Sequence, residues 1–91
     1  MRKGCKIQVF GKVQGVWFRG NTELKAKSLN LTGWVSNRSD GSVVIHAFGD
    51  PGAIKDLYQW CQTGPELARV DQVEVDDIPY EDHNEFIVRR I

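Results

Sequence analysis

The sequence predicts one α+β domain in which an antiparallel sheet carries two helices on the same face. Segments in which apolar and polar residues alternate, as in half-buried strands, occur near both ends of the chain and in its middle. Two further segments have apolar residues at helical spacing. A chain of 91 residues has room for a single domain, so residues 1–91 are expected to share one core.

The composition is that of a folded, soluble protein, with 41% apolar and 26% charged residues and no low-complexity tract. Twelve basic and twelve acidic residues cancel, which argues against binding nucleic acid through a broad positive field. An anionic ligand should therefore be small. No long apolar segment follows the basic start of the chain, so we expect neither a signal peptide nor a membrane span, but a monomer in the cytoplasm.

The first strand is expected at 5–13, where apolar residues alternate with polar ones and only Phe10 faces the other way. A loop over residues 14–20 follows it. Asn21 or Thr22 can cap the first helix, which is expected to end near Leu29. Asn30 suits the left-handed position after a helix, and Gly33 is expected to help turn the chain.

Residues 34–37 are expected to form the second strand, and Asp40-Gly41 favours a hairpin turn after it. The return strand, 42–48, places Val44, His46 and Phe48 on a face that the helices leave open. If exposed, they would form an apolar patch together with Phe10.

The second helix has clear boundaries, because Asp50 is a favourable cap, Pro51 a favourable first residue, and residues 63–65 read Thr-Gly-Pro. Its core stripe consists of Ile54, Leu57, Tyr58 and Cys61. A strand from about 68 to 75 follows, with a bulge near Asp71-Gln72 where the apolar phase slips. The acidic segment 76–85 is expected to be a solvated loop, and residues 86–91 a final short strand.

This order of elements, β-α-β-β-α-β, is the split β-α-β arrangement of the ferredoxin-like fold. In it the first two strands run parallel on either side of the third, so their carboxyl ends meet at one edge of the sheet. The first strand ends in the loop that leads to Arg19, and the second ends at Asn37. The topology therefore predicts that Arg19 and Asn37 converge.

Three segments resemble the acylphosphatases: Gly-Lys-Val-Gln-Gly-Val-Trp-Phe-Arg at 11–19, Gly-Trp-Val-Ser-Asn at 33–37 and Asp-Gly-Ser-Val at 40–43. The resemblance covers essentially the whole chain. It implies a ferredoxin-like fold and hydrolysis of the carboxyl-phosphate bond of a small-molecule acyl phosphate, without a metal or other cofactor. It matches Arg19 with the phosphate-binding arginine and Asn37 with the asparagine that positions the attacking water. Trp17 departs from the glycine that often occupies its position.

The residues suit this chemistry. An acyl phosphate expels a carboxylate whose conjugate acid has a pKa near ~4, so the leaving oxygen requires no general acid. A loop that opens a helix presents free amides to an anion, and arginine adds a bidentate fork. The hypothesis assigns phosphate binding to the loop residues, with Asn37 orienting the water. The loop residues are Gln14, Gly15, Val16, Trp17, Phe18 and Arg19.

Other readings stay open at this level. The same loop could serve a non-catalytic module that binds a phosphate ligand without turnover. Binding of RNA on the sheet is disfavoured by the zero net charge and the lack of a basic, aromatic-rich motif. His46 and His83 lack partners at metal-ligand spacing, and Cys5 and Cys61 are either free thiols or, less favoured, a disulfide.

Overall fold

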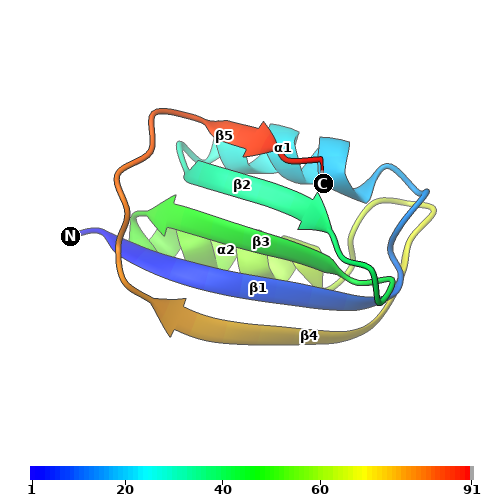
Figure 1. Ribbon diagram of the computed structural model, residues 1–91. Coiled ribbons are helices and arrows are strands. Elements are labelled where there is room, and N and C mark those ends of the chain that lie inside the picture. The colour runs from blue at the N-terminus through cyan, green and yellow to red at the C-terminus, as the bar shows by residue number, and fades with distance from the viewer. Residues whose placement is uncertain (91) are drawn as a thin grey trace.

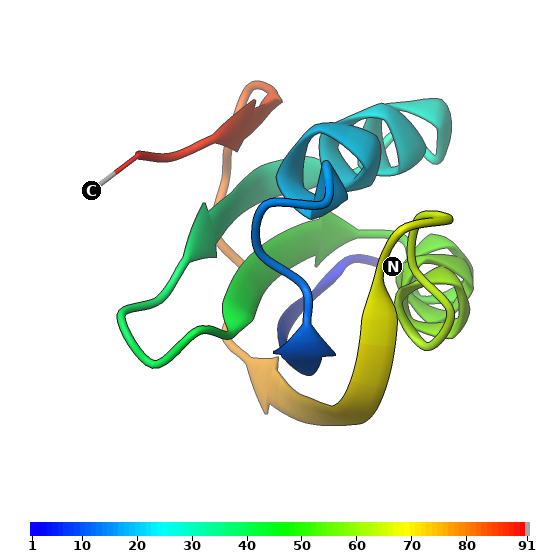
Figure 2. The same cartoon turned by 90° about the vertical axis from the view of Figure 1, so that its right-hand side faces the viewer.

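A computed structural model describes residues 1–90 and contains a five-stranded sheet in the order β4-β1-β3-β2-β5 (Figure 1). Two helices cover one face of this sheet, as Figures 1 and 2 show. The ferredoxin-like order of elements is thereby confirmed. The elements are β1 (Lys3–Lys12), α1 (Phe18–Ser28), β2 (Thr32–Asn37), β3 (Val43–Gly49), α2 (Pro51–Cys61), β4 (Arg69–Ile78) and β5 (Phe86–Val88).

The sheet is mixed, which corrects the expectation of a wholly antiparallel one. Strands β1 and β2 both pair antiparallel with β3, so they run parallel to each other as predicted. Strand β5 pairs parallel with β2. The segment between β4 and β5 crosses the sheet from one outer strand to the other (Figure 1). Strand β5 therefore starts at the end of the sheet where β4 finishes, and it runs in the direction opposite to β4. The expected strand 86–91 ends at Val88, and Ile91 lies outside the described residues.

Helix α1 begins earlier than the sequence predicted, at Phe18 rather than after Asn21 or Thr22. Neither of these two residues caps it. The Asn21 side-chain amide donates to the carbonyl of Trp17 (2.8 Å) and the Thr22 hydroxyl to that of Phe18 (2.7 Å). Both side chains bond back to a carbonyl four residues earlier, which places them inside the first turns of the helix.

Helix α2 follows its predicted boundaries. The Asp50 carboxylate accepts hydrogen bonds from the amides of Gly52 (2.9 Å) and Ala53 (3.3 Å), and Pro51 is the first helical residue. Of its expected core stripe, Ile54, Leu57 and Cys61 are buried, while Tyr58 is only half-buried.

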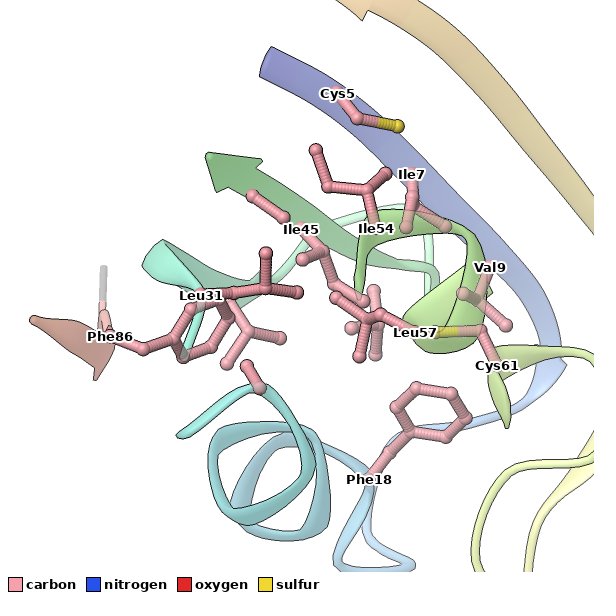
Figure 3. Packing of buried hydrophobic residues seen from close by; sticks show 14 of the residues in the cluster. Cys5, Ile7, Val9, Phe18, Leu31, Ile45, Ile54, Leu57, Cys61 and Phe86 are labelled. Carbon is pink, nitrogen blue, oxygen red and sulfur yellow. The ribbon is translucent and has the colours of Figure 1, made fainter. Parts of the chain in front are cut away.

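The main core lies between the sheet and the two helices (Figure 3). Ile7 and Ile45 from the sheet and Leu57 from α2 are completely buried there. Phe18 anchors the start of α1 against α2, with its ring centroid 5.4 Å from that of Trp60. Cys5 and Cys61 are both free and buried. Burial raises the pKa of the Cys5 thiol to about 11 and that of Cys61 to about 12.

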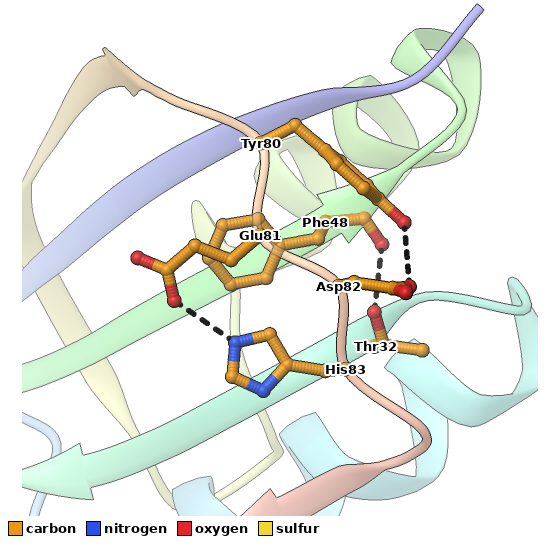
Figure 4. Close-up of polar contacts among 6 residues, drawn as sticks. All are labelled: Thr32, Phe48, Tyr80, Glu81, Asp82 and His83. Carbon is orange, nitrogen blue, oxygen red and sulfur yellow. Dashed lines mark hydrogen bonds and ion pairs between the residues drawn. The ribbon is translucent and has the colours of Figure 1, made fainter.

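The opposite face of the sheet is not open at Phe48 or Val44, and this corrects the expected exposed patch. Both side chains are 1% exposed. The segment 79–85 lies over Phe48, with the ring of His83 stacked on it at 4.9 Å and Tyr80 meeting it edge-on at 6.1 Å (Figure 4). A bond between His83 Nε2 and Glu81 Oε1 (3.0 Å) joins two residues of the same segment (Figure 4).

Strand β4 contains the predicted bulge. Phe10 pairs with Gln72 and Gly11 with Val70, which leaves Asp71 as the extra residue. The strand continues to Ile78, so the expected loop at 76–77 was wrong. These two acidic residues are exposed on the edge strand, where Asp77 pairs with Lys3 at 3.1 Å.

Gly33 was also misplaced, because it lies inside β2 rather than at a turn. Its φ is 129°, and a Cβ there would lie 1.9 Å from the carbonyl oxygen of His46. Close approach of two strands therefore requires glycine at this position.

Candidate active site

The carboxyl ends of β1 and β2 lie at the same end of the sheet, which faces the viewer in Figure 2. A cleft of about 620 Å³ opens there. Arg19, from the first turn of α1, and Asn37, from the end of β2, both line it. The structure thus brings together the two residues that the topology predicted to converge.

The loop between β1 and α1 presents its backbone to this cleft. Gly15 has a φ of 73°, and Trp17 has φ 67° and ψ 23°, so both lie in the left-handed region. Within residues 1–90, the N–H groups of residues 15–20 donate no hydrogen bond to another protein group. Free amides at the start of a helix favour an anion, because the helix dipole adds to their partial positive charge.

Trp17 adopts a left-handed backbone conformation although it carries the Cβ atom that glycine lacks. Such a conformation costs a non-glycine residue about 1–2 kcal/mol. The side chain is 78% exposed, so burial does not offset this cost. Its φ gives the physical reason why glycine suits this position.

Arg19 is half-buried and makes no ion pair within residues 1–90. The acidic side chain that lines the cleft, Glu23, pairs with Lys27 at 3.3 Å instead. The Arg19 guanidinium is therefore available for an anion, to which it can offer two parallel N–H donors.

The side-chain oxygen of Asn37 is the notable polar atom of the site. Asn37 Oδ1 is buried and has no hydrogen-bond partner among the described residues. Nearly all buried polar atoms in folded proteins are paired with protein or water. Because Asn37 also lines the cleft, its side-chain amide, unpartnered among the described residues, is suited to a water molecule or a ligand group.

Gln14 holds the loop to the turn that follows Asn37. Its side-chain amide donates to the carbonyl oxygens of Arg38 (2.7 Å) and Ser42 (2.9 Å). The Asp40 carboxylate braces the same turn by accepting from the Ser42 amide (2.9 Å) and hydroxyl (2.6 Å). These bonds to Ser42 lower the pKa of Asp40 below its ordinary value.

Four of the six loop residues assigned to phosphate binding line the cleft: Gly15, Trp17, Phe18 and Arg19. The other two differ. Val16 is 4% exposed and belongs to the core, and the Gln14 side chain is engaged with the turn. For these two residues, any contact with an anion would have to come from the backbone.

The sequence reasoning missed the contribution of the last strand. Ile87, Val88 and Arg90 line the cleft because Val88 pairs beside Val35 in the parallel register of β5 with β2. A parallel pairing of three residues leaves no periodic signal long enough to recognise.

The two histidines lie away from the cleft. The His46 ring stacks on Trp34 at 4.2 Å, and burial lowers its pKa. The guanidinium of Arg89 lies 4.5 Å from the centre of the Trp34 ring, and His83 stacks on Phe48.

No three His, Cys, Asp or Glu side chains among the described residues gather as metal ligands. Neither helix of the described residues is long and apolar enough to cross a membrane.

Comparison with known proteins points to one family. A family model described as Acylphosphatase matches residues 5–88. A relative from Marinobacter nauticus named Acylphosphatase is 54% identical over 73 residues, which are 80% of this chain and 79% of the relative. The structure of an acylphosphatase from Coxiella burnetii is 42% identical, with a TM-score of 0.94 over 97% of this chain and 93% of that one. The acylphosphatase from Bacillus subtilis is 33% identical, with a TM-score of 0.93 over 98% and 99%.

Proposed function

The chain belongs to the acylphosphatase family and hydrolyses acyl phosphates, and from this premise we propose how its cleft performs the reaction without a metal ion. Arg19 and the amides of residues 14–19 bind the phosphoryl group, and Asn37 orients the attacking water. The observation that carries the proposal is that Arg19 and Asn37 line one cleft, where the Asn37 Oδ1 atom has no hydrogen-bond partner among the described residues.

The leaving group decides which catalytic groups are needed. Water attacks phosphorus, the bond from phosphorus to the bridging oxygen breaks, and its electron pair leaves on a carboxylate. Because the conjugate acid of that carboxylate has a pKa of about 4, the departing oxygen needs no proton. The cleft therefore requires donors for the phosphoryl oxygens more than it requires an acid.

Arg19 and the loop amides supply these donors. The transition state of phosphoryl transfer is loose and spreads charge over three equatorial oxygens, so catalysis depends on positioning and electrostatic stabilisation. Donors fixed by the backbone need not reorganise when that charge develops, and loss of one such donor typically costs roughly 2.7–4 kcal/mol of barrier.

Asn37 binds the nucleophile. Its Oδ1 accepts a hydrogen bond from the water, which leaves a lone pair of the water directed at phosphorus. Among the described residues, the carboxylate in the lining, Glu23, pairs with Lys27, so a phosphoryl oxygen of the substrate takes the proton. The protein's task is then to align water, phosphorus and leaving oxygen.

The test is hydrolysis of benzoyl phosphate in excess chelator by the wild type, Arg19→Ala and Arg19→Lys. Arg19→Ala should lower kcat/KM by about a thousandfold, as loss of a transition-state arginine does. Arg19→Lys should lower it by about a hundredfold, because a point charge does not reproduce the fork. Arg69→Ala is the matched control, since Arg69 is exposed and pairs with Asp71 on β4.

Three results would contradict the proposal. Equal turnover by the wild type and Arg19→Ala would remove Arg19 from the mechanism. Loss of wild-type turnover in chelator would show that a metal takes part. Binding of phosphate without any turnover would instead favour the non-catalytic phosphate-binding module.

Several properties stay predictions. We expect one domain over residues 1–91, and a monomer in the cytoplasm that binds neither nucleic acid nor membrane.

A further inference from the structure

We infer that Trp17 forms an acyl-binding wall of the cleft, which makes the enzyme prefer acyl phosphates with an aromatic or branched apolar acyl group. This inference rests on the proposed function, because it assumes that the phosphoryl group binds at the loop amides beside Arg19. It adds a preference among substrates that neither Arg19 nor Asn37 provides.

The first observation is the exposure of the Trp17 side chain. It is 78% exposed and lines the cleft that Arg19 and Asn37 also line. A large apolar side chain that borders a polar site offers surface that an apolar ligand would cover.

The second observation is that folding gives no reason for a tryptophan at position 17. Its left-handed backbone conformation, φ 67°, favours glycine, and its ring is outside the core. Within residues 1–90 the ring pairs with no aromatic side chain and lies under no guanidinium. Strained residues of this kind concentrate at functional sites.

The third observation concerns distance along the substrate. The backbone amide of Trp17 is one of the proposed phosphate donors, so its side chain leaves the backbone directly beside the proposed phosphate site. One bridging oxygen separates phosphorus from the acyl carbon, and the acyl group therefore has to lie beside the loop. The cleft, about 620 Å³, falls in the range of about 300–1,000 Å³ typical of small-molecule sites and is larger than a phosphoryl group requires.

The face of an indole ring recognises apolar and aromatic surface, and the methyl group of an acetyl phosphate covers little of it. The contact is present in the bound substrate as well as in the transition state. Its loss should therefore appear in KM more than in kcat, and more for benzoyl phosphate than for acetyl phosphate.

The experiment compares kcat/KM for benzoyl phosphate and acetyl phosphate, expressed as a ratio, in the wild type, Trp17→Ala and Trp17→Phe. These two variants impose the same backbone constraint and differ in the ring. Trp17→Ala should lower the ratio by about threefold to tenfold, the size of an aromatic stacking contact. Trp17→Phe should keep it within about twofold, because the smaller ring still covers an aromatic acyl group.

Leu24→Ala is the control, because Leu24 is 67% exposed on α1 but lies outside the lining of the cleft. An unchanged ratio in Trp17→Ala, with both substrates affected equally, would overturn the inference and leave the proposed function standing. Failure of the wild type to hydrolyse either substrate would overturn both, so the two failures are distinguishable.

Discussion

The side-chain amide of Gln14 lies 2.7 Å from the carbonyl oxygen of Arg38, and this contact joins the loop before Arg19 to the turn after Asn37. The same amide donates a second hydrogen bond, to the carbonyl oxygen of Ser42 at 2.9 Å. The Gln14 side chain thus connects the segment that carries Arg19 to the segment that carries Asn37. Because its side-chain amide already donates these two hydrogen bonds, we predict that Gln14 positions the loop.

Replacing Gln14 by Ala should lower kcat/KM for benzoyl phosphate by about tenfold, because two hydrogen bonds of about 0.5–1.5 kcal/mol each fix the spacing of the site. Gln14→Glu should be at least as harmful, since a carboxylate repels the two carbonyl oxygens. Steady-state kinetics on both variants measure the effect. Gln59→Ala, at an exposed position of α2, is the control. Wild-type kinetics in Gln14→Glu would contradict this role.

Replacing Asn37 by Ala should separate activity from stability. It removes a buried acceptor that lacks a partner, so the free energy of unfolding should stay within about 1 kcal/mol of the wild type. The value of kcat should fall by about a hundredfold to a thousandfold, because the water loses its orienting group. Urea unfolding and kinetics on one preparation test both halves, and a large loss of stability would mean that Asn37 is mainly structural.

Replacing Trp17 by Gly should leave the free energy of unfolding unchanged or raise it by up to about 1.5 kcal/mol. Relief of the left-handed strain, about 1–2 kcal/mol, outweighs or balances the added backbone entropy of glycine, about 0.5–1 kcal/mol. Leu24→Gly is the matched control and should lose about 1 kcal/mol, because it places glycine inside α1. Urea denaturation compares the two variants, and equal destabilisation would show that Trp17 is unstrained.

The two buried thiols should weaken the fold in alkali. Each has an ordinary pKa of 9.0, raised by burial to about 11 in Cys5 and about 12 in Cys61. Below about pH 9 both the folded and the unfolded chain keep the protons, and the full stability is present. From about pH 9 upward the unfolded chain releases them first, so the free energy of unfolding falls by up to about 1.4 kcal/mol per pH unit and thiol.

Urea unfolding of the wild type and Cys61→Ala at pH 8 and at pH 10.5 measures how much the Cys61 thiol contributes to this loss of unfolding free energy. The cavity left by the substitution lowers stability at both pH values, but the wild type should lose more between them. Parallel losses in the two proteins would mean that Cys61 does not contribute.

Local patterns predicted the elements whose burial has a simple period. Helix α2 follows its cap, its proline and its apolar stripe, and the bulge at Asp71 follows a change of phase. The convergence of Arg19 and Asn37 followed from strand order alone. Helix α1 began earlier than expected because Asn21 and Thr22 bond backwards inside it, a choice that their side chains also allow at a cap.

The remaining differences depend on contacts between distant segments. The burial of Phe48 requires the segment with Tyr80 and His83 to cross the sheet, which no alternation within β3 could indicate. In the same way, the apolar side of the cleft depends on where β5 pairs. Ile87 could be placed only once the register with β2 was known.

The position of β1 in the sheet has a consequence for how the protein folds. Both neighbours of β1 come from much later in the chain, and on the β4 side Gly4 pairs with Ile78. Closing such long loops before their contacts form slows folding, toward the range of about milliseconds to seconds found for chains rich in distant pairings. The loop that we propose to bind phosphate leaves the end of this strand, so we expect it to reach its final shape during synthesis only after the later strands that pair with β1 have emerged.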